Sequence, residues 1–204
     1  MNALSTKMIT QVHRDGKIHQ QEYSCGKPVT AVEVIGETTI TGTRQQFWPD
    51  AEIFSMTTEY KYNILQARLR ELAYLNAGIT ITLTDLREKD EEGNYKHEVF
   101  YSEEGLVRFL NSSYDKLIED VIYINTEKQG VPIECAIMYN TSYRENLHSY
   151  VNNINTIEGG THEAGFRMAL TRTLKKYAED SKALEKAKVE IAGEDFREGL
   201  IAVI

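Results

Sequence analysis

Residues 121–139 read VIYINTEKQGVPIECAIMY, in which two apolar runs flank a short polar stretch. Every second position of the second run is apolar or aromatic, so these side chains would share one face of a strand: Val131, Ile133, Cys135, Ile137 and Tyr139. Such alternation on both sides of a polar break that contains glycine is typical of a β-hairpin. We therefore expect two paired strands with their turn at residues 127–130.

The longest helical pattern follows this hairpin and begins at Thr161. Residues 178–188 after it are polar and charged, which favours a loose connection. The alternation at residues 147–151 and the apolar run at 199–204 predict two further strands, the second of them buried. Within the helix, apolar side chains recur every three or four residues and would pack on the sheet: Phe166, Leu170, Leu174 and Tyr177.

A second set of elements precedes the hairpin. Residues 79–83 alternate as a strand with a return strand at 99–101, and a short helix is expected around 106–110. Before them, Thr58 can cap a helix that ends at the stop signal of residues 76–78. This mixture of strands and helices predicts an α/β or α+β domain. The apolar positions of the first helix are Ile64, Leu65, Leu69, Leu72 and Leu75.

The first 48 residues differ, because short strands dominate them. Apolar positions on both sides of Asp15-Gly16 predict a hairpin there, and further strands follow up to Phe47. A single helical stretch, residues 2–5, cannot cover both faces of the implied sheet, so we expect this part to belong to a larger domain. Pro49-Asp50 marks the expected boundary, which divides the chain into domains at residues 1–48 and 49–204.

Composition excludes several classes of protein. The net charge of −8 and the pI near 5.2 argue against a surface devoted to nucleic acid. No apolar run is long enough to cross a membrane and residues 1–6 lack the features of a secretory signal, so the expected location is the cytoplasm. Cys25 and Cys135 lie far apart without any CxxC motif, which removes the basis for a disulfide framework or a zinc ribbon.

Charge is unevenly distributed along the chain. Residues 164–188 carry seven basic groups against three acidic ones. This segment could face DNA, or it could be an ordinary solvated helix face whose Lys-rich end complements the helix dipole. Residues 85–104 are acidic instead, which is typical of a solvated hairpin tip.

No pattern in the sequence indicates catalytic or metal-binding residues. The five histidines share no ligand spacing with each other or with a cysteine, and no nucleophile elbow is present. The most pointed local feature is Gly159-Gly160-Thr161-His162, because two glycines before a helix can present backbone amides to an anion. The alternative is structural: the glycines make a tight turn into the helix, Thr161 caps it and Glu163 complements its dipole. No Walker lysine follows.

Several motifs, spread over nearly the whole chain, resemble the gyrase B family of type IIA topoisomerases. These motifs are HRDGK (13–17), TGT (41–43), FWP (47–49), RLRELA (68–73), NNI (152–154), EGGTH (158–162), GFR (165–167), LTRTL (170–174) and REGLIAV (197–203).

The resemblance implies the end of a GHKL ATPase domain, built of antiparallel strands, followed by a transducer domain. The transducer would have a ribosomal-protein-like βαβ fold with a left-handed crossover. The activity implied is that of an ATP-dependent topoisomerase whose transducer relays ATP binding and hydrolysis to the DNA gate during negative supercoiling. Its partners would be DNA, the gyrase A subunit, and a second copy of the B-type protein.

The resemblance also implies that the full-length protein binds ATP and Mg²⁺ through residues outside this segment, both before Asn2 and after Ile204. The segment alone is therefore expected to be inactive, to bind neither cofactor, and to bind nucleic acid weakly or not at all. No catalytic residue and no metal ligand is carried over to it.

Thr43 is the single cofactor-binding position that the resemblance carries over, near the adenine end of the nucleotide pocket. Its hydroxyl could hold a bound water, or it could belong to an ordinary strand threonine. The sequence departs from the family at Gln45, where relatives have an apolar residue, and at Ile157, near which many have an arginine. Two alternatives remain: a topoisomerase IV B-type subunit, and a stand-alone nucleic-acid-binding module.

Overall fold

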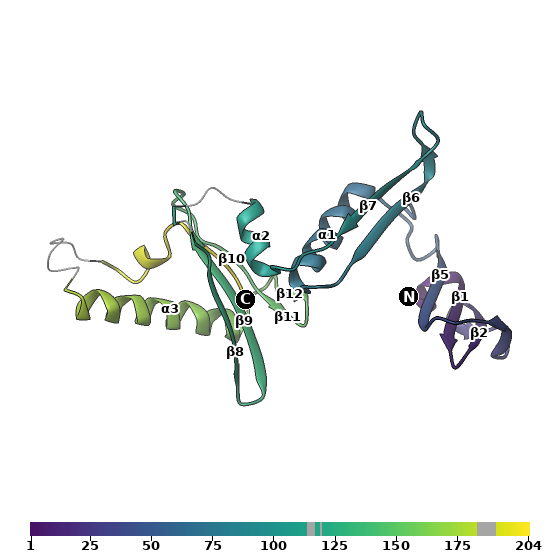
Figure 1. Cartoon of the computed structure of the whole chain (residues 1–204), viewed down its shortest axis with the longest axis horizontal. Helices are drawn as coiled ribbons and strands as arrows, with labels where there is room; N and C mark the ends of the chain where they lie inside the picture. The colour runs from purple at the N-terminus through teal and green to yellow at the C-terminus, as the bar shows by residue number, and fades with distance from the viewer. Residues whose placement is uncertain (114–116, 119, 183–190) are drawn as a thin grey trace. The chain divides into compact units, whose positions relative to one another are not determined.

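The computed structural model describes residues 1–113, 117–118, 120–182 and 191–204. Two compact units are present, Met1–Lys61 and Tyr62–Ile204 (Figure 1). The mixed α/β fold predicted from the sequence is confirmed. The domain boundary expected after residue 48 stays a prediction. No helix within the described ranges is long and apolar enough to cross a membrane.

The first unit is an antiparallel sheet with a short helix at its start. The strands lie in the order β3-β2-β1-β5, and β4 also pairs with β2. The predicted hairpin at Asp15-Gly16 is confirmed, because Arg14 pairs with Lys17 and both turn residues have positive φ, 52° and 76°. The elements are η1 (Asn2–Leu4), β1 (Ser5–Arg14), β2 (Lys17–Ser24), β3 (Lys27–Pro28), β4 (Glu33–Glu37) and β5 (Gly42–Pro49).

The second unit is built around a four-stranded sheet in the order β10-β13-β9-β8. β13 is parallel to β10 and antiparallel to β9, so α3 lies in the crossover between two parallel neighbours. The handedness expected for this crossover stays a prediction. The elements are α1 (Tyr62–Leu75), β6 (Ile81–Lys89), β7 (Tyr95–Phe100), α2 (Leu106–Ser113), β8 (Ile122–Lys128), β9 (Val131–Tyr139), β10 (Asn146–His148), β11 (Tyr150–Val151), β12 (Ile154–Asn155), α3 (Thr161–Asp180), η2 (Asp195–Arg197) and β13 (Leu200–Val203).

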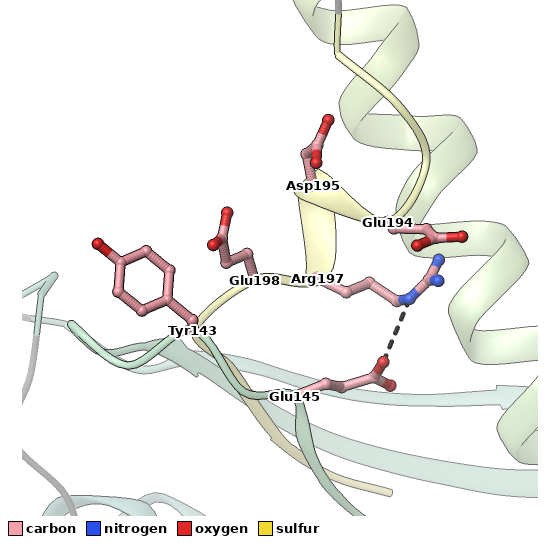
Figure 2. A pocket seen from close by; sticks show the side chains of 6 residues that line it. All are labelled: Tyr143, Glu145, Glu194, Asp195, Arg197 and Glu198. Atoms are coloured by element: carbon pink, nitrogen blue, oxygen red, sulfur yellow. Dashed lines mark hydrogen bonds and ion pairs between the residues drawn. The ribbon is translucent and has the colours of Figure 1, made fainter.

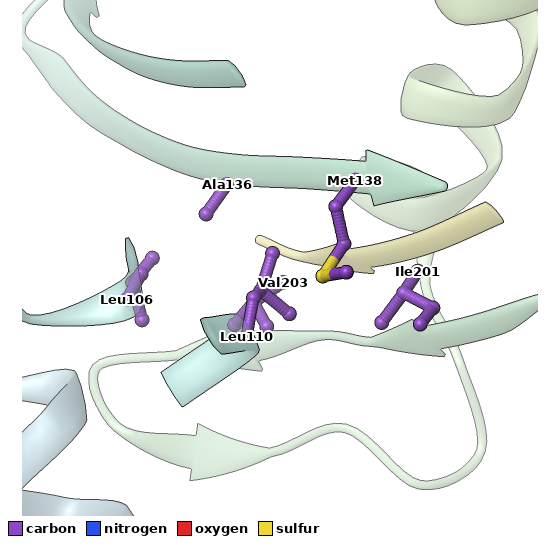
Figure 3. Close-up of a cluster of buried hydrophobic side chains, with 6 residues drawn as sticks. All are labelled: Leu106, Leu110, Ala136, Met138, Ile201 and Val203. Carbon is purple, nitrogen blue, oxygen red and sulfur yellow. The ribbon is translucent and has the colours of Figure 1, made fainter. Parts of the chain in front are cut away.

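The core lies on both faces of this sheet. All four residues of β13 are fully buried, as the apolar run at 199–204 predicted, because helices pack on each side of the strand. One cluster packs against α2 and contains Leu106, Leu110, Ala136, Met138, Ile201 and Val203 (Figure 3). The other contains Cys135, Ile137, Leu200 and Ala202, against which Phe166 and Leu170 of α3 pack.

The predicted apolar face of β9 is buried along only part of its length. β13 pairs with residues 136–139 of β9, whereas the part nearer the turn pairs with β8 alone. Val131 and Ile133 are therefore 58% and 41% exposed. The apolar stripe of α3 also ends early: Phe166 and Leu170 pack against the core, whereas Tyr177 is 70% exposed and Ala178 is buried in its place.

The start of α1 and the cap of α3 differ from the prediction, whereas the predicted start of α3 at Thr161 is confirmed. α1 begins at Tyr62 rather than after Thr58, and Thr57 instead accepts a bond from the backbone N–H of Glu59 in a turn. α3 has Gly160 at its N-cap, so Thr161 is the first helical residue and does not cap the helix. In α1 the predicted apolar residue Ile64 points to solvent, being 61% exposed.

The other predicted elements are mostly present. α1 ends at Leu75, and Gly78 has the left-handed conformation expected of a helix stop, with φ of 84°. The strand expected at 147–151 is divided into β10 and β11. The acidic segment forms the β6–β7 hairpin, whose tip at residues 90–94 is exposed. The loose connection expected at 178–188 starts later, because α3 extends to Asp180, and residues 183–190 lie outside the described part.

Candidate functional site

Thr43 lies near the start of β5 in the first unit, opposite Val12 of β1, and its side chain is exposed. Two residues further along, Gln45 lies opposite Thr10, and the Thr10 hydroxyl donates to Gln45 Oε1 at 2.8 Å. Because side chains alternate along strands, these four residues share one face of the sheet. That face offers a hydroxyl at Thr43 beside a polar wall at Gln45, where the family resemblance implied an apolar one.

The N-terminal turn of α3 is already occupied by a negative charge. The Glu163 carboxylate accepts a hydrogen bond from Ser149 at 2.9 Å and binds Arg167 Nη1 at 2.5 Å. It lies close enough that a Cβ on Gly159 would be 3.4 Å from Glu163 Oε2. An added anion would meet this carboxylate, so the geometry favours the structural interpretation of the two glycines. A Cβ on Gly160 would lie 2.7 Å from the His162 ring, so a side chain at this position would displace the imidazole.

A cluster of charged side chains joins α3 to η2 and to the start of β10. Glu145 accepts from Arg167 Nε at 2.6 Å. It also accepts from Arg197 Nε at 3.2 Å (Figure 2). Arg197 Nη1 also donates to Thr171 Oγ1 at 3.2 Å and to the Gly193 carbonyl at 3.1 Å. The pKa of the Arg167 guanidinium is raised, chiefly by its hydrogen bond to Glu145. Arg167 is therefore bound within the protein, although it was counted among the basic groups that could face DNA.

A hollow of about 310 Å³ lies beside this cluster. Four of its six lining residues are acidic, so it suits neither phosphate nor any other anion. The lining residues are Tyr143, Glu145, Glu194, Asp195, Arg197 and Glu198 (Figure 2). The sequence did not predict this cluster, because Arg167 and Arg197 lie 22 and 52 positions from Glu145. Both arginines belong to motifs of the family resemblance, GFR and REGLIAV, which were the available signal.

The remaining candidates for chemistry are dispersed or buried. Over the described ranges, no group of three or more His, Cys, Asp or Glu side chains could hold a metal ion. Burial raises the pKa of the Cys135 thiol to about 12, so this side chain does not supply a thiolate at neutral pH. Cys25 is exposed, on a turn with φ of 47°.

The family model for DNA gyrase B matches residues 104–204. Among curated proteins, the gyrase B protein of Eisenibacter elegans is 58% identical and that of Cytophaga hutchinsonii 56% identical, in each case over 100% of this chain and 43% of the relative. The chain thus spans less than half the length of these relatives.

Solved structures give the same result. The 43K ATPase domain of Thermus thermophilus gyrase B, in complex with an aminocoumarin, superposes with a TM-score of 0.81 at 33% identity, covering 99% of this chain and 55% of that one. The topoisomerase IV ATP-binding domain of Francisella tularensis, in complex with a small-molecule inhibitor, gives 0.79 at 25% identity, covering 99% and 54%. The family match lies in the second unit, whereas the identity of the relatives and the shared fold extend over both units. The chain therefore belongs to the DNA gyrase B family.

Proposed function

We propose that this chain is the section of a gyrase B protein in which the GHKL ATPase domain passes into the transducer. The transducer relays ATP binding and hydrolysis to movement of the DNA gate during negative supercoiling. The observation that carries the proposal is the superposition on the 43K ATPase domain of T. thermophilus gyrase B, because it includes 99% of this chain.

Each unit supports one half of this assignment. The all-antiparallel sheet of Met1–Lys61 is suited to be the last part of an ATPase domain, and the layered α/β unit Tyr62–Ile204 is suited to be the transducer. The domains of the proposal are residues 1–48 and 49–204. Helices on both faces share the core of one sheet, so a displacement of one element strains its neighbours, which is the property that a relay needs.

ATP and Mg²⁺ belong to the full-length protein in this proposal. Thr43 contributes a hydroxyl near the adenine end of the pocket, where it could hold a bridging water. Its exposure on the β5 face is compatible with that role. We expect residues 1–204 alone to bind neither ATP nor Mg²⁺ and to hydrolyse no ATP, because the resemblance carries no catalytic residue and no metal ligand to them.

The partners proposed for the full-length protein are the gyrase A subunit, DNA and a second copy of the B-type protein, in the cytoplasm. For this chain alone we expect weak or no binding of nucleic acid. The Arg172, Lys175 and Lys176 side chains of α3 are exposed, but Arg167 is held by two carboxylates.

A chimera tests the proposal directly. The matching segment of the E. elegans gyrase B protein is replaced by residues 1–204, and ATP hydrolysis and supercoiling are measured with gyrase A. We expect both activities to be retained. A folded chimera that hydrolyses ATP at the parental rate but cannot supercoil DNA would contradict the relay role.

Thr43→Val in this chimera tests the nucleotide contact. We expect a higher KM for ATP by roughly 3- to 10-fold, because the variant loses one hydrogen bond. Thr10→Val is the matched control, since it makes the same change on the same face of the sheet and leaves Thr43 in place. Equal increases of KM for ATP in the two variants would contradict a contact between Thr43 and the nucleotide.

A topoisomerase IV B-type subunit is the second candidate, supported by the F. tularensis structure. It predicts that a chimera with the partner protein of topoisomerase IV decatenates DNA in preference to supercoiling it. A stand-alone nucleic-acid-binding module is the third. It predicts that the purified chain binds DNA with a steep salt dependence in a filter-binding titration.

A further inference from the structure

The hairpin β11–β12 has a two-residue turn in an unusual backbone conformation. Val151 pairs with Ile154, and the residues between them, Asn152 and Asn153, have φ of 50° and 66°. Two consecutive left-handed residues form the turn that matches the twist of a hairpin, and asparagine tolerates this conformation. The NNI motif is thus explained locally by the turn, but the turn also determines where the Asn153 backbone points.

One side of this hairpin is bound to α1. Arg68 Nη2 donates to the Asn153 carbonyl at 2.9 Å, while Arg68 Nη1 binds Glu71 at 2.5 Å. Glu71 accepts in turn from the Tyr150 hydroxyl. The Asn153 side chain donates to Asn76 Oδ1 at 2.8 Å, just beyond the end of α1. Polar groups on or next to the last turns of α1 and on the hairpin are therefore joined in one network.

The other side is bound to the first turn of α3. The buried Ser149 hydroxyl donates to Glu163 at 2.9 Å and contacts the Thr156 hydroxyl at 2.6 Å. Thr156 lies 3.3 Å from His162 Nε2. Because Glu163 also binds Arg167, these contacts lead on to the cluster around Glu145 and η2.

Directional polar contacts, more than core packing, hold this hairpin in place. Val151 and Ile154 are 51% and 69% exposed, and Tyr150 is the hairpin residue that packs against the core cluster. Hydrogen bonds require a particular angle and distance, so a shift of one partner is passed to the next or breaks the bond. An apolar contact tolerates more sliding.

We propose that residues 149–156 are a coupling element, through which a displacement of α1 is passed to the N-terminal turn of α3 and to the Glu145–Arg197 cluster. The two sets of contacts have no residue in common and are linked through the hairpin backbone and the Ser149–Thr156 pair that closes it. Arg68 is the positioning residue of this element, because its guanidinium joins Glu71 to the turn carbonyl. Its significance for a relay rests on the function proposed above; the coupling itself does not.

Amide hydrogen exchange of the whole chain, measured by mass spectrometry, tests the coupling. We expect Arg68→Ala to speed exchange at residues 149–156 and in the first turn of α3 by ~5-fold or more, because a lost hydrogen bond changes local opening by about this factor. Arg70→Ala is the matched control. Its side chain lies on the same helix but binds Glu98 and stacks on Phe100, so its effect should stay near α1 and β7.

The buried strand β13 serves as the internal reference. Faster exchange at residues 161–167 with unchanged protection of β13 supports the proposal, and unchanged exchange at residues 161–167 overturns it. If Arg68→Ala also speeds exchange in β13, the test is repeated with Asn153→Gly. Glycine keeps the left-handed turn and removes only the contact with Asn76. Loosening of β13 in both variants also overturns the coupling, because the effect is then one of global stability.

A functional measurement follows in the chimera. There Arg68→Ala should lower supercoiling per ATP hydrolysed by severalfold, with Arg70→Ala unchanged. A positive exchange result without a change in this ratio would leave the coupling intact and count against the relay function instead.

Discussion

The backbones of Gly199 and Asn140 lie in direct contact: the Asn140 N–H donates to the Gly199 carbonyl at 2.9 Å, and a Cβ on Gly199 would lie 2.5 Å from the Asn140 carbonyl oxygen. Gly199 also has φ of +70°, which L side chains rarely adopt. The contact brings the start of β13 against the end of β9, and both features require glycine at this position.

Gly199→Ala should therefore destabilise the second unit by ~2–4 kcal/mol, combining backbone strain with a clash against main-chain atoms. Urea unfolding monitored by circular dichroism measures the effect. The control is Gly165→Ala in α3, where nothing lies within 4 Å of the added Cβ. There we expect a gain of ~0.5–1 kcal/mol from the higher helix propensity of alanine. A stable Gly199→Ala variant would contradict the described junction.

The two thiols should react very differently. Cys25 is exposed, whereas burial raises the pKa of Cys135 to about 12. At pH 8 the native protein should release one equivalent of thionitrobenzoate rapidly from Ellman's reagent, and two after denaturation in guanidinium chloride. Cys25→Ser should abolish the rapid phase. Two rapidly reacting thiols in the native state would show that the α3 side of the core is open.

Stability should fall with acidification partly through His148. Burial lowers the pKa of this imidazole below its ordinary value of 6.5, an effect that the nearby Glu71 partly offsets, and the ring packs edge-on against Phe109. The unfolded state then binds a proton at a higher pH than the folded state. The contribution of His148 is therefore complete above pH 6.5 and is lost as the pH falls through the folded-state pKa.

The measurement is the free energy of unfolding at pH 7.5 and at pH 5.5, for the wild type and for His148→Gln. Other groups titrate in this interval, so the comparison of the two slopes isolates His148. We expect a smaller loss in the variant. Equal losses would show that His148 titrates alike in both states.

The Glu145 cluster should contribute modestly to stability. Arg167→Met removes two charge-assisted hydrogen bonds but keeps most of the aliphatic stem, and the Arg167 side chain is 38% exposed. Solvent screening limits the expected loss to ~1–2 kcal/mol. Arg172→Met, on the exposed face of the same helix, should change stability by less than ~0.5 kcal/mol. Thermal unfolding of both variants separates the two cases, and equal losses would exclude a specific role for the cluster.

Local signals predicted much of the fold. Asp15-Gly16 specified the first hairpin because both residues accept positive φ, and the apolar run at 199–204 indicated a strand covered on both faces. Periodicity does not show how far a neighbouring element extends. Val131 and Ile133 continue the predicted apolar face past the last residue that pairs with β13, and they are exposed. Tyr177 was expected to pack on the sheet with the rest of its helical stripe and is also exposed.

The candidate sites were less predictable, since they depend on contacts between distant residues. Alternation places Thr43 on a strand, but its connection to a nucleotide pocket rests on the family resemblance. Arg167 and Arg197 meet at Glu145 because α3 and η2 both lie against the start of β10, which no local pattern records. The cap of α3 was misassigned because glycine also occupies N-cap positions, and Gly160 caps this helix without a side-chain hydrogen bond.

β13 follows β10 and β9 in chain order and yet lies between them in the sheet. During synthesis, β9 lacks its partner on this side and β10 lacks the strand that holds it in the sheet until residues 200–203 leave the ribosome. Any nascent chain that stalls before this point presents two unpaired strand edges, which are sites for chaperone binding or for aggregation. Folding of the second unit is thereby timed to the arrival of four residues.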